Sequence, residues 1–125
     1  MNPAYLMTSA AIPKSQRISG IVIDAREHAV DPSMSPEVID MQGNLVYGTI
    51  SYSRSKAVNR GPVGYAYSMD DRNVSQRVGS NPLFIEAVGS LDDDIYITSM
   101  DANKVRTAEK SFGVLSNCRV MLLLQ

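Results

Sequence analysis

Two apolar runs constrain the fold of this chain more than any other feature of its sequence. Residues 18–25 read ISGIVIDA, and residues 118–125 read CRVMLLLQ. Each run has the length of a strand but little of the alternation that marks a half-exposed one, which is typical of a strand covered on both faces. We therefore expect both runs to form central strands of a β-sheet.

The segment at residues 36–52, PEVIDMQGNLVYGTISY, predicts a β-hairpin. Its turn should fall at residues 41–44, where Gly43 can adopt the positive φ that such a turn requires. The second arm should continue as a strand as far as Tyr52. The prolines and serines of the preceding stretch, residues 31–36, indicate an irregular connection rather than a helix.

The middle of the chain carries weaker signals. Residues 53–62 are polar and predict a loop, and residues 63–69 predict a strand that its glycines weaken. Residues 70–82 are expected to hold one short helical turn, with Asp70 as its cap and Asp71 in its first turn.

The last third of the sequence predicts a strand–helix–strand unit. Residues 83–91 resemble one strand, and the three aspartates at 92–94 resemble a turn. Residues 95–99 then alternate as a strand should. A helix is expected over about residues 100–112, and Gly113 should end it.

One face of this helix is apolar. Ser99 or Asp101 can cap its N-terminus by accepting a backbone N–H bond. The side chains on the apolar face should pack against the sheet: Ala102, Val105, Ala108 and Phe112.

These elements predict the fold class and the domain organisation. We expect an α+β protein with a mixed β-sheet of five to seven strands and one main helix, about 100–112, in the C-terminal strand–helix–strand unit. Residues 18–125 should form a single α+β domain that is large enough for its own hydrophobic core.

Residues 1–17 show no sustained period and are expected to form an N-terminal arm. The arm contains Tyr5, Leu6 and Met7, a short apolar stretch without a place in the predicted sheet. We expect these three residues to be interaction residues that pack on a neighbouring subunit.

Composition excludes several classes of function. Twelve basic and thirteen acidic residues give a net charge of −1, and the basic residues form no stripe, so nucleic acid is not an expected partner. No apolar run approaches the roughly 20 residues of a membrane-spanning helix. The first residues lack the positive region of an export signal, so the chain is either cytoplasmic or a piece whose signal lies upstream.

Charged side chains follow the first apolar run, in GIVIDAREHAVDP at residues 20–32. Asp24, Arg26, His28 and Asp31 are the candidate binding residues, because a carboxylate and an imidazole at the end of a buried strand can meet in a pocket. The alternative is structural: Asp24 pairs with Arg26 or accepts backbone N–H groups of the following loop.

Reactive groups are scarce in this chain, because His28 is the only histidine and Cys118 the only cysteine. A catalytic zinc ion takes three protein ligands, usually including further histidines or cysteines. The sequence has no glycine-rich phosphate loop and no calcium-binding loop. We therefore expect no catalytic residues, no metal and no cofactor, and we expect Cys118 in the core.

Five segments in register resemble a known domain family. The domain is the C-terminal one of bacterial envelope proteins that also carry a domain akin to flagellar basal-disc lipoproteins (FlgP-like). Glu27 stands where that family usually has a glycine. The segments are GIVIDAR (20–26), PSMSPEVIDMQGNLVYG (32–48), RVGSNPLFIEAVG (77–89), DIYITSMDANKVR (94–106) and LSNCRVMLLL (115–124).

The resemblance implies a periplasmic location near a flagellar or outer-membrane ring, and it transfers no active site. We expect a non-enzymatic structural module of the cell envelope that acts through contacts with other envelope or flagellar proteins, or as a homo-oligomer. The alternative is a small-ligand-binding or hydrolytic domain with its site around Asp24 and His28. A third possibility is a cytosolic scaffold.

Overall fold

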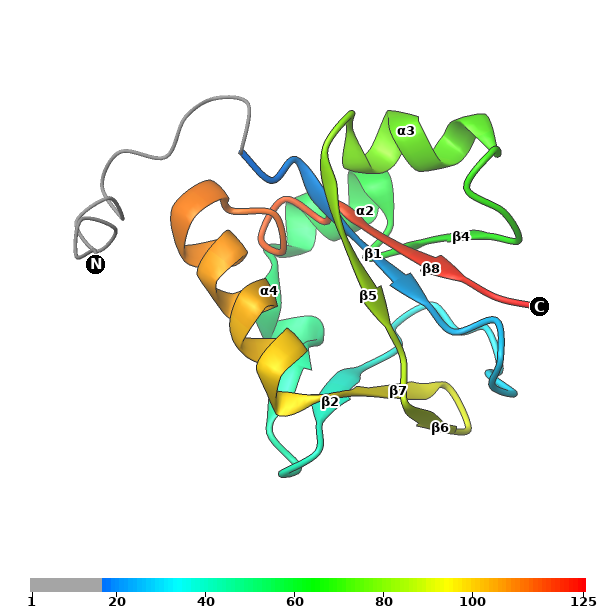
Figure 1. The fold of residues 1–125 in the computed structure, drawn as a ribbon. Helices are drawn as coiled ribbons and strands as arrows, with labels where there is room; N and C mark the ends of the chain where they lie inside the picture. Colours follow the sequence, from blue (N-terminus) through cyan, green and yellow to red (C-terminus); the bar gives the residue numbers. More distant parts are fainter. Residues whose placement is uncertain (1–16) are drawn as a thin grey trace, which may run out of the picture.

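The structure, a computed structural model, describes residues 17–125 (Figure 1). The described part contains eight strands in two four-stranded sheets, together with three α-helices. The expected α+β class is therefore confirmed. The expectation of a single mixed sheet of five to seven strands was wrong, because the strands divide between two sheets.

Sheet A is wholly parallel and holds both apolar runs at its centre. Both central strands are buried almost throughout, as expected for strands covered on two faces. Because all four strands run parallel, their carboxyl ends lie at the same end of the sheet. The strand order is β4 (Gly64–Ala66), β8 (Val120–Leu123), β1 (Gly20–Asp24) and β5 (Pro82–Glu86).

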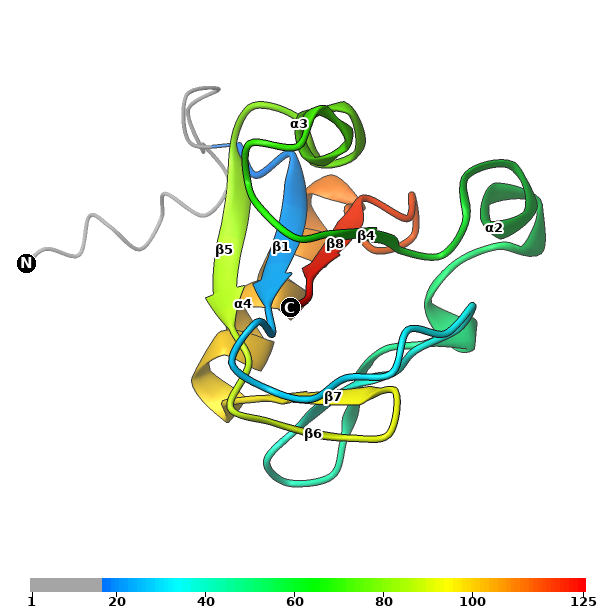
Figure 2. The ribbon, with the colours of Figure 1, turned by 90° about the vertical axis from the view of Figure 1, so that its right-hand side faces the viewer.

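Sheet B lies across the carboxyl ends of β1 and β5 (Figure 2). Two antiparallel hairpins, β2–β3 and β6–β7, join through the parallel pair β2–β7. The hairpin predicted at Gly43, whose φ is 86°, is confirmed. The strand order is β3 (Leu45–Tyr47), β2 (Val38–Asp40), β7 (Asp94–Ile97) and β6 (Gly89–Leu91).

Residues 83–91, expected as one strand, are divided between the two sheets. Strand β5 ends at Glu86 in sheet A, and β6 begins at Gly89 in sheet B. The two residues between them, Ala87 and Val88, still donate backbone N–H bonds to Asp24 and Tyr96 respectively. These bonds allow the chain to change sheets without leaving its backbone groups unpaired.

Helix α4 (Ser99–Phe112) confirms the main predicted helix. Thr98, rather than Ser99 or Asp101, is the N-cap, and its hydroxyl accepts a bond of 3.1 Å from the backbone N–H of Asp101. Gly113 ends the helix with a φ of 67°, as expected. The predicted apolar face is in the core, where Ala102, Val105 and Ala108 are buried and Phe112 is half-buried.

The other two helices correct the predictions for the middle of the chain. Helix α2 (Arg54–Arg60) replaces the expected loop; it buries no residue, so its sequence has no apolar period to detect. Helix α3 (Arg72–Val78) confirms the expected turn, but Asp71 rather than Asp70 caps it. The expected strand at residues 48–52 is instead a 3₁₀ turn, η3 (Thr49–Ser51).

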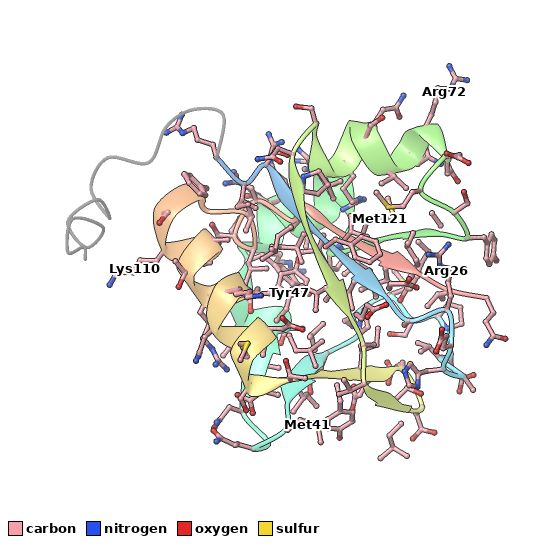
Figure 3. All side chains as sticks on the ribbon, in the orientation of Figure 1. Arg26, Met41, Tyr47, Arg72, Lys110 and Met121 are labelled. Carbon is pink, nitrogen blue, oxygen red and sulfur yellow. The ribbon has the colours of Figure 1, made fainter. Side chains whose placement is uncertain are left out.

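Two hydrophobic layers enclose sheet A (Figures 1 and 3). Alternate residues of β1 and β8 point to opposite faces, as the pleat requires. On one face Val22, Met121 and Leu123 pack with α3. The other face packs with α4 and sheet B in the larger cluster, which includes Ile21, Ile23, Ile85, Leu122, Ile95, Ile97 and Val105.

Candidate functional site

Asp24 ends β1 at the carboxyl edge of sheet A and is fully engaged by Arg26, which Figure 3 labels. Its Oδ1 accepts from the Nε of Arg26 at 2.9 Å and from the backbone N–H of Arg26 at 3.0 Å. Its Oδ2 accepts from Nη2 at 2.9 Å. Hydrogen bonds from the Arg26 side chain hold the pKa of Asp24 below its ordinary value, so the carboxylate is charged and paired.

His28 lies on the turn that follows this pair. Its backbone N–H donates to the carbonyl of Ala25, and its Nε2 lies 3.1 Å from the carbonyl oxygen of Ala87. A carbonyl can only accept, so Nε2 is the donor in this contact. The imidazole is thereby tied to the segment that joins the two sheets, which leaves Nδ1 as its other polar atom.

A small cavity brings several of the predicted residues together. Its volume is about 140 Å³, below the roughly 300–1,000 Å³ of a typical small-molecule site. Asp24 and His28 line it, and so do Glu27 and Glu86. Glu86 was missed because only the parallel register, which places it beside Asp24, shows that the two strand ends are neighbours.

Asp31 does not join this cavity. It is exposed, and the structure places it beside the β6–β7 turn, where its backbone N–H donates to the carbonyl of Asp92 at 2.9 Å. The predicted interaction residues Tyr5, Leu6 and Met7 lie outside the described residues.

The chemical inventory of the cavity is limited. Within residues 17–125, no group of three His, Cys, Asp or Glu side chains is arranged to hold a metal ion. Cys118 is buried, as expected. No helix among the described residues is both long and apolar enough to cross a bilayer. The ligand-binding or hydrolytic alternative stays a prediction.

An apolar concavity lies elsewhere, between the edge strand β5 and helix α4. This β5–α4 groove has a volume of about 550 Å³. Leu83 and Ile18 contribute from the sheet side, while Met100, Thr107 and Phe112 contribute from the helix. The sequence carried one signal for it: Met100 is a large apolar residue placed off the core-facing stripe of α4, and its side chain is 71% exposed.

Arg77 on α3 lines a second, polar cavity of about 420 Å³. Its guanidinium donates to the carbonyls of Arg60, Gly61 at 3.1 Å and Cys118 at 2.9 Å. Desolvation lowers the pKa of Arg77. Since these carbonyls lie at the end of α2 and just before β8, the side chain joins three segments and has a structural role.

Asp40 is the one charged side chain that the described core buries, with an exposed fraction of 2%. Its Oδ1 accepts backbone N–H bonds of 2.9 Å from Gln42 and Asn44, and its Oδ2 accepts from Arg106 at 3.1 Å. The backbone N–H of Asn44 is the main cause of a lowered pKa. Asp40 thus shapes the β2–β3 turn and joins it to α4.

Fold and site together define an α+β domain whose parallel sheet ends at a small, charged cavity beside a second, mixed sheet. The family model that describes the second domain of Treponema pallidum Tp0624 matches residues 20–125, and the chain belongs to this family. The match begins with β1 and includes every described helix and strand. No curated protein matches the chain. The family description mentions no flagellar lipoprotein, so the expected FlgP-like association stays a prediction.

Proposed function

We propose that this domain is a non-enzymatic assembly module of the bacterial cell envelope, which acts by binding further copies of itself and other envelope proteins. The observation that carries the proposal is the β5–α4 groove, an apolar concavity of about 550 Å³ on the surface. Monomeric proteins rarely expose large contiguous apolar surfaces, and those that are exposed mark interaction sites.

The hydrogen bonds that Asp24 and His28 already make in the charged cavity support a non-enzymatic role. A general acid or base has to present a free proton-binding atom to its substrate. Here both carboxylate oxygens of Asp24 accept from Arg26, and Nε2 of His28 is occupied by the Ala87 carbonyl. The Asp24 carboxylate and Nε2 of His28 therefore stabilise the turn after β1, which leaves Nδ1 as the one imidazole atom open to proton transfer.

The edge of sheet A extends the proposed contact surface. Among residues 17–125, strand β5 pairs only with β1. Edge strands present backbone groups that can pair with another chain. Phe84, at the centre of β5, is half-exposed. The groove and the free edge of β5 are adjacent, because Leu83 belongs to both. One partner segment can therefore use backbone pairing and apolar burial together.

The envelope setting rests on the resemblance of five segments to the domain that accompanies FlgP-like lipoprotein domains. On this basis we place the domain in the periplasm, near a flagellar or outer-membrane ring. Fractionation of cells that express the native gene product tests the location. Recovery of the protein in the periplasmic or outer-membrane fraction is expected, whereas recovery in the cytoplasm would favour the scaffold alternative.

Sedimentation velocity across the micromolar range tests the assembly function. We expect a concentration-dependent oligomer that Met100→Glu weakens, because the substitution places a charge in the groove. Val58→Glu on α2 is the matched control, since Val58 is 74% exposed and Met100 71% exposed, and both exchanges replace an exposed apolar helix residue by glutamate. A chain that stays monomeric at every concentration would contradict self-assembly.

A further inference from the structure

We propose that the polar cavity lined by Arg77 binds a phosphoryl group, either as free phosphate or as the phosphate monoester of a small molecule. The cavity lies between the end of α2, the edge strand β4 and α3. Its volume of about 420 Å³ is within the range of small-molecule sites. It shares no lining residue with the β5–α4 groove, so the inference is independent of the proposed assembly function.

The lining of this cavity carries positive charge and hydrogen-bond donors. Its polar side chains come mainly from two helices: Arg60 on α2, and Asn73, Gln76 and Arg77 on α3. Among the described residues, no aspartate or glutamate lines the cavity. Neither arginine belongs to any of the three ion pairs found among residues 17–125. The cavity therefore holds two cationic side chains without a carboxylate to neutralise them, and an anion is the ligand that fits.

Arg77 is held in place before any ligand arrives. Its Nη1 donates to the carbonyls of Gly61 and Cys118, and its Nη2 donates to the carbonyl of Arg60. The carbonyls at the end of α2 would otherwise repel an anion, and the guanidinium engages them. Because the side chain is already fixed, binding does not cost its rotational freedom.

Nε of Arg77 is left for a ligand. It has no hydrogen-bond partner among residues 17–125, and no buried side-chain nitrogen or oxygen in this range lacks one, so Nε is open to solvent. Gly64 permits this position of the side chain, because a Cβ there would lie 2.6 Å from Nε. Burial and the charge of Arg60 both lower the pKa of Arg77, as expected for neighbouring cations without a counter-ion. An anion bound at Nε would relieve this repulsion.

The directions of the donors favour a phosphoryl group over a carboxylate. A carboxylate pairs best with two parallel N–H groups of one guanidinium. Both Nη atoms of Arg77 are engaged by carbonyls, so this guanidinium offers a single N–H. A phosphoryl group has three terminal oxygens, which can accept from donors on different elements, here α2 and α3.

Titration of the full-length chain with sodium phosphate, with sodium chloride added to keep the ionic strength constant, tests the site. In ¹H–¹⁵N correlation spectra we expect saturable shifts at the backbone amides of Gly64, Asn73 and Arg77. Arg60→Gln should weaken binding by about tenfold or more, because it removes a charged donor. Arg54→Gln is the matched control: it removes the same charge from the same helix outside the cavity, and should weaken binding by less than about twofold.

A carboxylate placed in the cavity gives a second measurement. Gln76→Glu should abolish saturation by phosphate, whereas Ser75→Glu, next to it on α3 but outside the cavity, should weaken binding by less than about twofold. Arg60 and Gln76 are exposed, so both cavity variants should fold, which circular dichroism checks.

Two further ligands identify the chemistry of the anion. Tighter binding of glycerol phosphate than of inorganic phosphate supports a monoester as the natural ligand, and equal binding supports free phosphate. Saturation by acetate at concentrations as low as those of phosphate refutes the phosphoryl group. The site itself is refuted by an absence of saturable shifts, or by equal weakening in Arg60→Gln and Arg54→Gln.

Discussion

Replacing Tyr47 with phenylalanine should lower the free energy of unfolding at neutral pH. It should also reduce the stability that the domain loses at alkaline pH. Tyr47 lies on β3 of sheet B with an exposed fraction of 1%, and Figure 3 labels it in the interior. Its hydroxyl donates to the carbonyl of Pro62, in the segment that leads into β4 of sheet A. Tyr47→Phe leaves this carbonyl without its donor, which should cost about 1–3 kcal/mol at pH 7.

The pH dependence follows from the same burial. Desolvation raises the pKa of Tyr47 above its ordinary value of 10.0, so the folded state keeps the phenolic proton that the unfolded state loses. The contribution of the neutral hydroxyl is complete below about pH 10 and is lost as the pH rises, by about 1.4 kcal/mol at pH 11. Tyr52 and Tyr65, whose pKa values burial also raises, affect both proteins equally.

Urea unfolding followed by circular dichroism at neutral and alkaline pH measures both effects. The free energies of unfolding of the two proteins should converge by about 1.4 kcal/mol between pH 7 and pH 11. Tyr67→Phe is the control for loss of a hydroxyl from an exposed tyrosine, and it should change stability at pH 7 by less than about 0.5 kcal/mol. A difference between wild type and Tyr47→Phe that stays constant with pH would refute the reasoning.

Three further predictions concern the close approach at Gly20, the acid stability given by Asp40 and the burial of Cys118. Gly20→Ala should destabilise it by about 1–3 kcal/mol, because the added Cβ would lie 2.6 Å from the backbone of α3. Gly89→Ala, with its nearest atom at 4.0 Å, should change stability by less than about 1 kcal/mol, and equal urea midpoints for the two variants would contradict the close approach. The lowered pKa of Asp40 predicts stability that is present above about pH 4 and lost as the pH falls further, so Asp40→Asn should flatten the acid limb of the unfolding curve; an unchanged limb would exclude this source. Cys118 should react with a thiol reagent only as fast as the domain opens, and labelling at the rate of a free thiol would contradict its burial.

Local sequence predicted the elements whose signal is contained within a few residues. The apolar runs that form β1 and β8 were predicted to be central strands, because a strand covered on both faces is apolar on both faces. Both strands are buried. Gly43 marked the β2–β3 turn, and Gly113 marked the end of α4, since each adopts a positive φ. The pairing of Asp24 with Arg26 was one of two structural readings, and the structure shows it together with the backbone N–H bond.

The errors have physical causes. Helix α2 buries nothing and therefore lacks periodicity, so capping by Ser53 and the end at Gly61 were its only signals. The segment 83–91 is continuous in its apolar character, but its division between sheets depends on which strands pair with it. No pattern along the chain reports such pairing between distant residues.

The amino-acid sequence by itself determined the class of the fold, the two central strands, the first hairpin and the main helix, because each depends on hydrophobic period and turn chemistry over neighbouring residues. Only the tertiary structure decided that the strands form two sheets, that Glu86 lies beside Asp24, and that β5 and α4 leave an apolar groove between them. These features join residues far apart in the chain, and their geometry is set by the packing of whole elements rather than by any local preference.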